Sequence, residues 1–73
     1  MPWHHDPAMQ ALRLTYNAAV SAHADCSRVL TAAALRGGLP SEAAIAAEAK
    51  ARTRMDDARD RLHQAMKRAI ADD

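Results

Sequence analysis

The residues best suited to chemistry are a histidine and a cysteine three positions apart, His23 and Cys26. Residues at this spacing lie on the same side of a helix, so two copies across a dimer axis would present two imidazoles and two thiolates, a tetrahedral zinc set. A single H-x-x-C lacks the repeated ligand spacing of zinc modules. We therefore favour a structural interpretation, in which His23 fixes helix register and hydrogen-bonds to a partner, while Cys26 packs as a small apolar group. We expect no bound metal and no cofactor, with zinc binding by this pair as the alternative.

The other potential ligands are scattered along the chain. Residues 4–6, His-His-Asp, can chelate a metal, but adjacent histidines in a tail are more often simply solvated. His63 lies about 12 Å further from the predicted turn than His23, at 1.5 Å per helical residue. Glu48 has no obvious second carboxylate for acid–base work, and we expect it to pair with Arg52 and to reach solvent.

Enzymatic activity is not expected. The spacing supports no Ser-His-Asp or Cys-His arrangement, and residues 37–38, Gly-Gly, are typical of a helix terminator instead of a phosphate-binding loop. A bundle rich in alanine also leaves little space for a substrate-sized cavity. For the aromatic Trp3 we expect a hydrophobic lid over the open end of the helix pair, near Met66 and Ile70, with ligand recognition as the less favoured role.

Basic residues concentrate in the second half of the chain, although the formal net charge is only +1. Seven of the ten lie between positions 50 and 68: Lys50, Arg52, Arg54, Arg59, Arg61, Lys67 and Arg68. One interpretation is a nucleic-acid-binding regulator that would use Arg52, Arg54, Arg59, Arg61 and Arg68 against phosphates. The other is a solvated helix surface with pairs four residues apart: Glu48–Arg52, Arg52–Asp56 and Asp57–Arg61. We favour the second, because three aspartates interrupt the run and no aromatic side chain is present there for base stacking.

Helix start and stop signals divide the chain into two nearly equal helices. Aspartate followed by proline at positions 6–7 is typical of a helix start. Residues 37–40, Gly-Gly-Leu-Pro, form the one firm interruption, and Ser41 can cap a second helix. The expected elements are a tail over 1–6, a first helix over about 7–36, a turn over 37–41 and a second helix over about 42–71. A short turn folds equal helices back on each other, so we predict an all-α antiparallel hairpin as a single domain over 7–73.

Apolar residues recur at alternating spacings of three and four, which is typical of helices that pack along a seam. The first predicted seam consists of Met9, Leu12, Tyr16, Ala19, His23, Cys26, Leu30 and Ala33. The second consists of Ala44, Glu48, Ala51, Met55, Ala58, Leu62, Ala65 and Ala69. Each seam therefore holds one strongly polar residue among apolar ones.

The apolar content is large in number but small in size. Hydrophobic residues make up 49% of the chain, yet nineteen of them are alanine and none is phenylalanine. Chains below roughly 70–80 residues seldom build a self-sufficient core. We therefore expect two hairpins to pair into a homodimeric four-helix bundle, with a monomeric hairpin, or one ordered on a larger partner, as the alternative. The apolar part of the expected interaction surface is Leu14, Val20, Val29 and Leu35.

These features predict a small non-enzymatic interaction or adaptor protein that acts through helix packing and self-association. The expected partners are a second copy and another helical protein, with nucleic acid disfavoured. No stretch approaches the roughly 20 apolar residues of a membrane span, and the sequence has no secretory signal pattern. A single cysteine cannot form an internal disulfide, so we expect a cytoplasmic location, and the alanine and arginine content is typical of a GC-rich bacterial genome.

Overall fold

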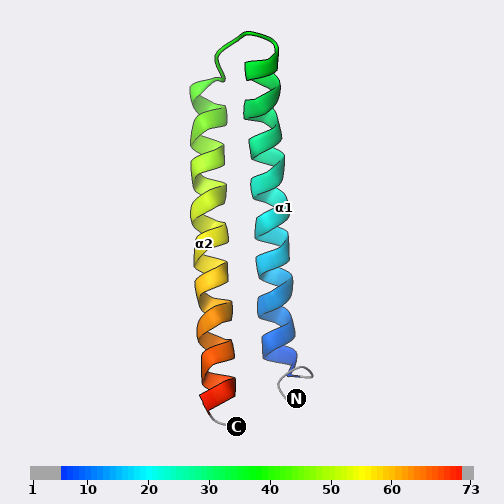
Figure 1. Ribbon diagram of the computed structural model, residues 1–73, viewed down its shortest axis with the longest axis vertical. Coiled ribbons are helices and arrows are strands. Elements are labelled where there is room, and N and C mark those ends of the chain that lie inside the picture. The colour runs from blue at the N-terminus through cyan, green and yellow to red at the C-terminus, as the bar shows by residue number, and fades with distance from the viewer. Residues whose placement is uncertain (1–5, 72–73) are drawn as a thin grey trace.

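The computed structural model describes residues 6–71, and over that range the chain forms two helices and no strand. Helix α1 spans Pro7–Leu35 and helix α2 spans Glu42–Ala71. Figure 1 shows them side by side and antiparallel, with the start of α1 and the end of α2 together at the end opposite the turn. The predicted all-α hairpin is therefore confirmed. The predictions about Trp3, His4 and His5 concern residues outside the described range.

Side-chain caps begin both helices. The Asp6 carboxylate accepts a hydrogen bond from the Ala8 amide, with 2.9 Å between N and Oδ1. Pro7 occupies the first turn of α1, where an N–H group would have no hydrogen-bond acceptor within the helix, so the lack of one in proline costs no hydrogen bond. At the start of α2 the Ser41 hydroxyl accepts a hydrogen bond from the Ala44 amide at 3.1 Å. Each cap satisfies an amide that the helix itself leaves unpaired.

A glycine in the left-handed conformation ends α1. Gly37 has a φ of +75°, and its amide donates to the Ala34 carbonyl at 3.0 Å. The Gly38 amide donates to the Ala33 carbonyl at 3.1 Å, which completes a Schellman motif. The helix ends one residue before the predicted position because Arg36 is already the cap, with a ψ of 2°.

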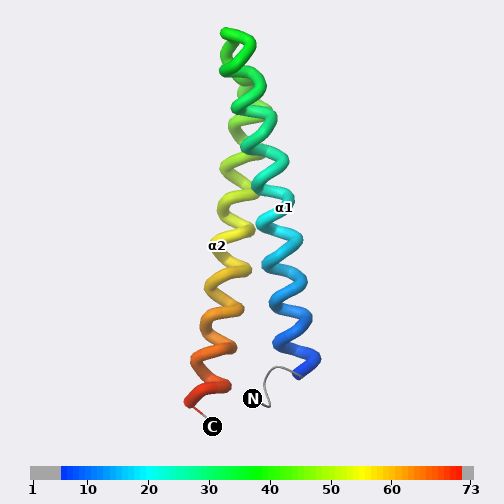
Figure 2. The backbone as a smooth tube through the Cα atoms, turned by 45° about the vertical axis from the view of Figure 1, so that its right-hand side comes forward, coloured from blue at the N-terminus to red at the C-terminus, as the bar shows by residue number. Residues whose placement is uncertain are grey.

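The hairpin is a narrow rod of 53 × 15 × 14 Å. In Figure 2, turned by 45°, α1 crosses in front of α2 near the turn and separates from it toward the other end, so the two axes are inclined to each other. Inclined axes of this kind are usual where the side-chain ridges of one helix pack into the grooves of another. Within the described range no helix is long and apolar enough to cross a membrane.

Both predicted seams lie between the helices. All of their residues are buried or half-buried, from Met9 to Ala33 on α1 and from Ala44 to Ala69 on α2. The seam divides the surface of the hairpin into two sides. Residues that flank the seam in each helix lie on one side or the other of the plane that contains both helix axes.

The core between the helices is thin. Among the described residues only Met9, Ala51, Ala58 and Leu62 are buried, and no side chain is less than 2% exposed. Two of these four residues are alanine, so the hairpin buries only two large apolar side chains. Seven large apolar side chains remain exposed: Leu14, Val20, Val29, Leu35, Leu39, Ile45 and Ile70.

Candidate functional site

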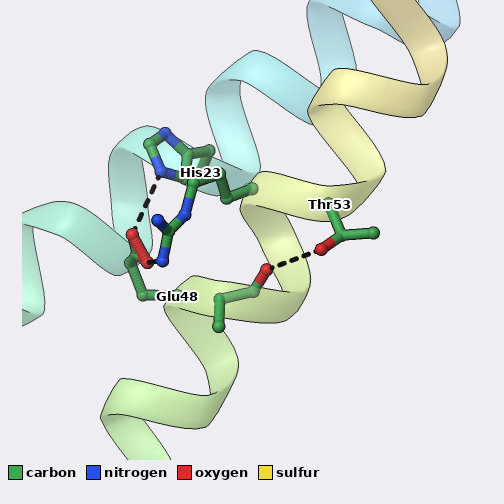
Figure 3. A network of polar contacts seen from close by, with 5 residues as sticks. His23, Glu48 and Thr53 are labelled. Carbon is green, nitrogen blue, oxygen red and sulfur yellow. Dashed lines mark hydrogen bonds and ion pairs between the residues drawn. The ribbon is translucent and has the colours of Figure 1, made fainter.

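The strongly polar residues of the two seams meet between the helices. His23 of α1 and Glu48 of α2 point toward one another, with 3.5 Å between Nε2 and Oε1 (Figure 3). Arg52, one turn further along α2, donates to the other carboxylate oxygen of Glu48 at 3.0 Å. The predicted Glu48–Arg52 pair is confirmed. The Glu48 side chain is half-buried, with 15% of it exposed.

His23 is incompletely satisfied in this cluster. Its Nε2 atom is buried and makes no hydrogen bond to any described residue. The predicted hydrogen bond of His23 to a partner stays a prediction. The distance to Glu48 suits an ion pair when the imidazole is protonated, but not a hydrogen bond. The contact could have been anticipated, because each predicted seam contained one strongly polar residue and buried polar groups require partners.

His23 and Cys26 turn to different sides of the hairpin. His23 leans toward Glu48, while Cys26 lines a hollow on the opposite side of the seam together with Ala22 and Ala51. His63 is exposed on α2. Among residues 6–71, no group of three or more His, Cys, Asp or Glu side chains is arranged to hold a metal ion.

The arginines of α2 fall into two groups with different surroundings. Arg52 pairs with Glu48, and Arg59 lies 3.4 Å from Asp56 and 3.7 Å from Asp60. The predicted Arg52–Asp56 pair is not formed, because each of the two side chains is engaged elsewhere on α2. The predicted Asp57–Arg61 pair is also absent.

The second group consists of Arg54, Arg61 and Arg68, which follow one another at intervals of seven residues. They line three consecutive hollows between α1 and α2. The first hollow has a volume of about 420 Å³ and also contains Lys50. Neighbouring hollows share Arg54 and then Arg61, so the three follow one another along this side of the hairpin. We call this row of hollows the basic groove. No ion pair joins these four cations to any described residue.

The floor of the basic groove is made of small apolar side chains. In the first two hollows they come from both helices: Ala18, Ala19, Ala22 and Cys26 on α1, and Ala47, Ala51 and Ala58 on α2. Leu12 and Ala65 continue the floor in the third hollow. This floor was not predicted from the sequence, although the seven-residue spacing of Arg54, Arg61 and Arg68 already placed them on one side of a helix.

The opposite side of the hairpin carries apolar residues of both helices among polar and charged ones, which include Arg13, Arg52 and Arg59. Heptad positions place one group of residues there, which we call the apolar flank: Val20, Ala24 and Ala34 on α1, and Ile45, Ala49, Met66 and Ile70 on α2. Ile45 and Ile70 are 51% and 61% exposed, and the sequence analysis did not include them in the interaction surface.

The four apolar residues predicted to take part in the interaction surface are all exposed, and they lie on three different sides of the hairpin. Val20 belongs to the apolar flank and Val29 lies on the side of the basic groove. Leu14 and Leu35 are on the face of α1 that points away from α2, and they are 69% and 82% exposed. The structure therefore does not bring these four side chains together.

The chain matches no known family model, no curated protein and no solved structure. Function must therefore be argued from the two sides of the hairpin themselves.

Proposed function

We propose that this chain is a non-enzymatic cytoplasmic interaction protein that acts by helix packing and pairs with a second copy into a four-helix bundle. The thin core carries the proposal: two large apolar side chains are buried and seven are exposed. Burying one such side chain contributes about 1.5–3 kcal/mol, whereas ordering each residue costs roughly 1.5 kcal/mol. A second hairpin gives each helix a second neighbour and removes exposed apolar surface from water.

The apolar flank is the surface best suited to this pairing. It presents the exposed side chains of Val20, Ile45 and Ile70 on one side of the hairpin. The two arginines in its middle, Arg52 and Arg59, already have carboxylate partners on α2. Burying an unpaired charge costs several kcal/mol. Because Arg52 and Arg59 keep their carboxylate partners, covering this flank does not incur that cost for them.

Sedimentation of the full chain over a range of concentrations tests the proposal. We expect a dimer at micromolar concentration that dissociates on dilution. Val20→Glu combined with Ile45→Glu introduces charge into the apolar flank and should raise the dissociation constant about a hundredfold. Leu14→Glu combined with Leu35→Glu adds the same charge on the outer face of α1 and should leave the dimer intact.

Two results would contradict the proposal. A folded monomer at every concentration would show that the hairpin needs no second copy. A larger effect of the Leu14 and Leu35 substitutions would assign the contact to the outer face of α1 and not to the apolar flank.

A further inference from the structure

We infer that the basic groove is a docking site for an acidic amphipathic helix of another protein. This inference extends the proposed interaction function and rests on it for a stably folded hairpin. The groove and the apolar flank lie on opposite sides of the hairpin, so docking in the groove and pairing through the flank do not compete. A third helix lying in the groove would contact α1 and α2 together, as in helix-in-groove recognition.

The charges of the groove call for an acidic partner. Lys50, Arg54, Arg61 and Arg68 have no ion pair with the described residues, whereas Arg52 and Arg59 on the other side are paired. At 1.5 Å per residue the three arginines are spaced about 10.5 Å apart. A partner helix with a carboxylate at every seventh residue would have the same spacing, so each carboxylate could pair with one of the three arginines.

The floor of the groove determines which apolar side chains a partner helix would need. Its residues are mostly alanine, so the groove is wide and lacks large side chains of its own. Leucine, isoleucine or methionine side chains on a partner helix would fill these hollows, as knobs fill holes in a coiled coil. The combination of a small apolar floor and one basic wall therefore specifies large apolar residues next to a row of acidic ones.

A second copy of this chain does not fit that description. The acidic residue of α1 in the groove's vicinity is Asp25, which pairs with Arg28 on the same helix. On α2, Glu48, Asp56 and Asp60 are engaged with arginines of the same helix. Neither helix offers a row of carboxylates at seven-residue intervals. The charges match a different protein better than a second hairpin.

Nucleic acid also fits the groove less well than a helix. A phosphate backbone makes no use of an apolar floor, and no aromatic side chain lines the groove for base stacking.

Fluorescence anisotropy with a labelled peptide tests the inference directly. The probe is a four-heptad helical peptide with leucine at its core positions and glutamate along one flank, made in two versions that place the glutamates on either side of the leucines. The control peptide carries lysine in place of glutamate. At low salt the full chain should bind one of the acidic versions with micromolar affinity and should not bind the lysine peptide.

Matched variants separate docking in the groove from general attraction between opposite charges. Arg54→Gln, Arg61→Gln and Arg68→Gln together should weaken binding about tenfold or more. Arg13→Gln, Arg36→Gln and Lys67→Gln together remove the same charge elsewhere and should weaken it less than about twofold. Ala22→Leu, which fills the floor, should also weaken binding, whereas Ala46→Leu on the far side of α2 should not. Circular dichroism confirms that each variant remains helical.

Several outcomes would overturn the inference. One is that neither acidic peptide binds at low salt. A second is that Ala22→Leu has no effect, which would mean attraction without docking. A third is that a single-stranded DNA oligonucleotide binds more tightly than either peptide and loses affinity with the same three arginines. Sedimentation at the concentration of the binding experiment reports the state of the dimer, and circular dichroism reports the fold. Loss of peptide binding by a protein that is still dimeric and helical therefore contradicts this inference and not the proposed self-association.

Discussion

At the residue scale, the position of each side chain relative to the seam decides its role. Arg52 and Arg59 lie beside carboxylates on the apolar flank and are neutralised there. Arg54 and Arg61 lie on the other side, where the only carboxylate lining the groove is Asp57, and they have no ion pair with the described residues. Charged residues four positions apart were predicted to pair, among them Arg52 and Asp56. Asp56 pairs with Arg59 instead, three positions away, and this depends on side-chain geometry that the spacing alone does not determine.

The same rule separates His23 from Cys26. Although three residues apart, they occupy neighbouring seam positions that lean to opposite sides, toward Glu48 and toward the basic groove. A two-fold axis on one side of the hairpin would therefore bring together either the histidines or the cysteines of two chains, and not both.

A zinc titration follows from this separation. We expect an equimolar addition of zinc to untagged protein to leave the thermal midpoint unchanged, because a histidine pair or a cysteine pair alone does not complete a tetrahedral site. Differential scanning calorimetry with and without zinc provides the measurement. A rise in the midpoint that Cys26→Ser and His23→Ala each abolish would instead establish the histidine and cysteine pair as ligands.

At the scale of elements, local signals account for most of the fold. The caps at Asp6 and Ser41 and the glycines of the turn act through hydrogen bonds within a few residues, so they were readable without tertiary information. The seams could be predicted because the spacing of three and four residues between apolar positions follows from the geometry of a single helix. The sequence placed Leu14 on the outer face and Val20 and Val29 beside the seam. That Val20 and Val29 lie on opposite sides of the hairpin, each with different residues of α2, was not predicted, because it depends on how the two helices pack.

The turn provides a sharp test of this local account. Gly37 has a φ of +75°, so Gly37→Ala should destabilise the protein by about 1 kcal/mol through backbone strain. Gly38 does not share that conformation, and a Cβ there would lie 3.8 Å from the Ala33 carbonyl oxygen, an ordinary contact. Gly38→Ala should therefore change stability by only a few tenths of a kcal/mol. Urea denaturation of both variants makes the comparison, and an equal loss for the two would contradict the assigned turn geometry.

At the scale of the whole molecule, the hairpin has two sides with different chemistry. The apolar flank, with its two central arginines paired, suits a second copy, while the basic groove, with its unpaired cations, suits an acidic helix. One narrow rod could in this way join its own copy to another protein. Composition predicted the need for a partner, since alanine dominates the apolar residues, but the assignment of partners to sides required the three-dimensional arrangement of the charges.

The central claim is that one hairpin alone buries too little to be stable, and thermal unfolding at several protein concentrations tests it most directly. If unfolding is coupled to dissociation of a dimer, the midpoint measured by far-UV circular dichroism should rise by about 5 °C for each tenfold increase in concentration. A cooperative transition of a monomer, with a midpoint that stays constant across the same concentrations, would contradict the account.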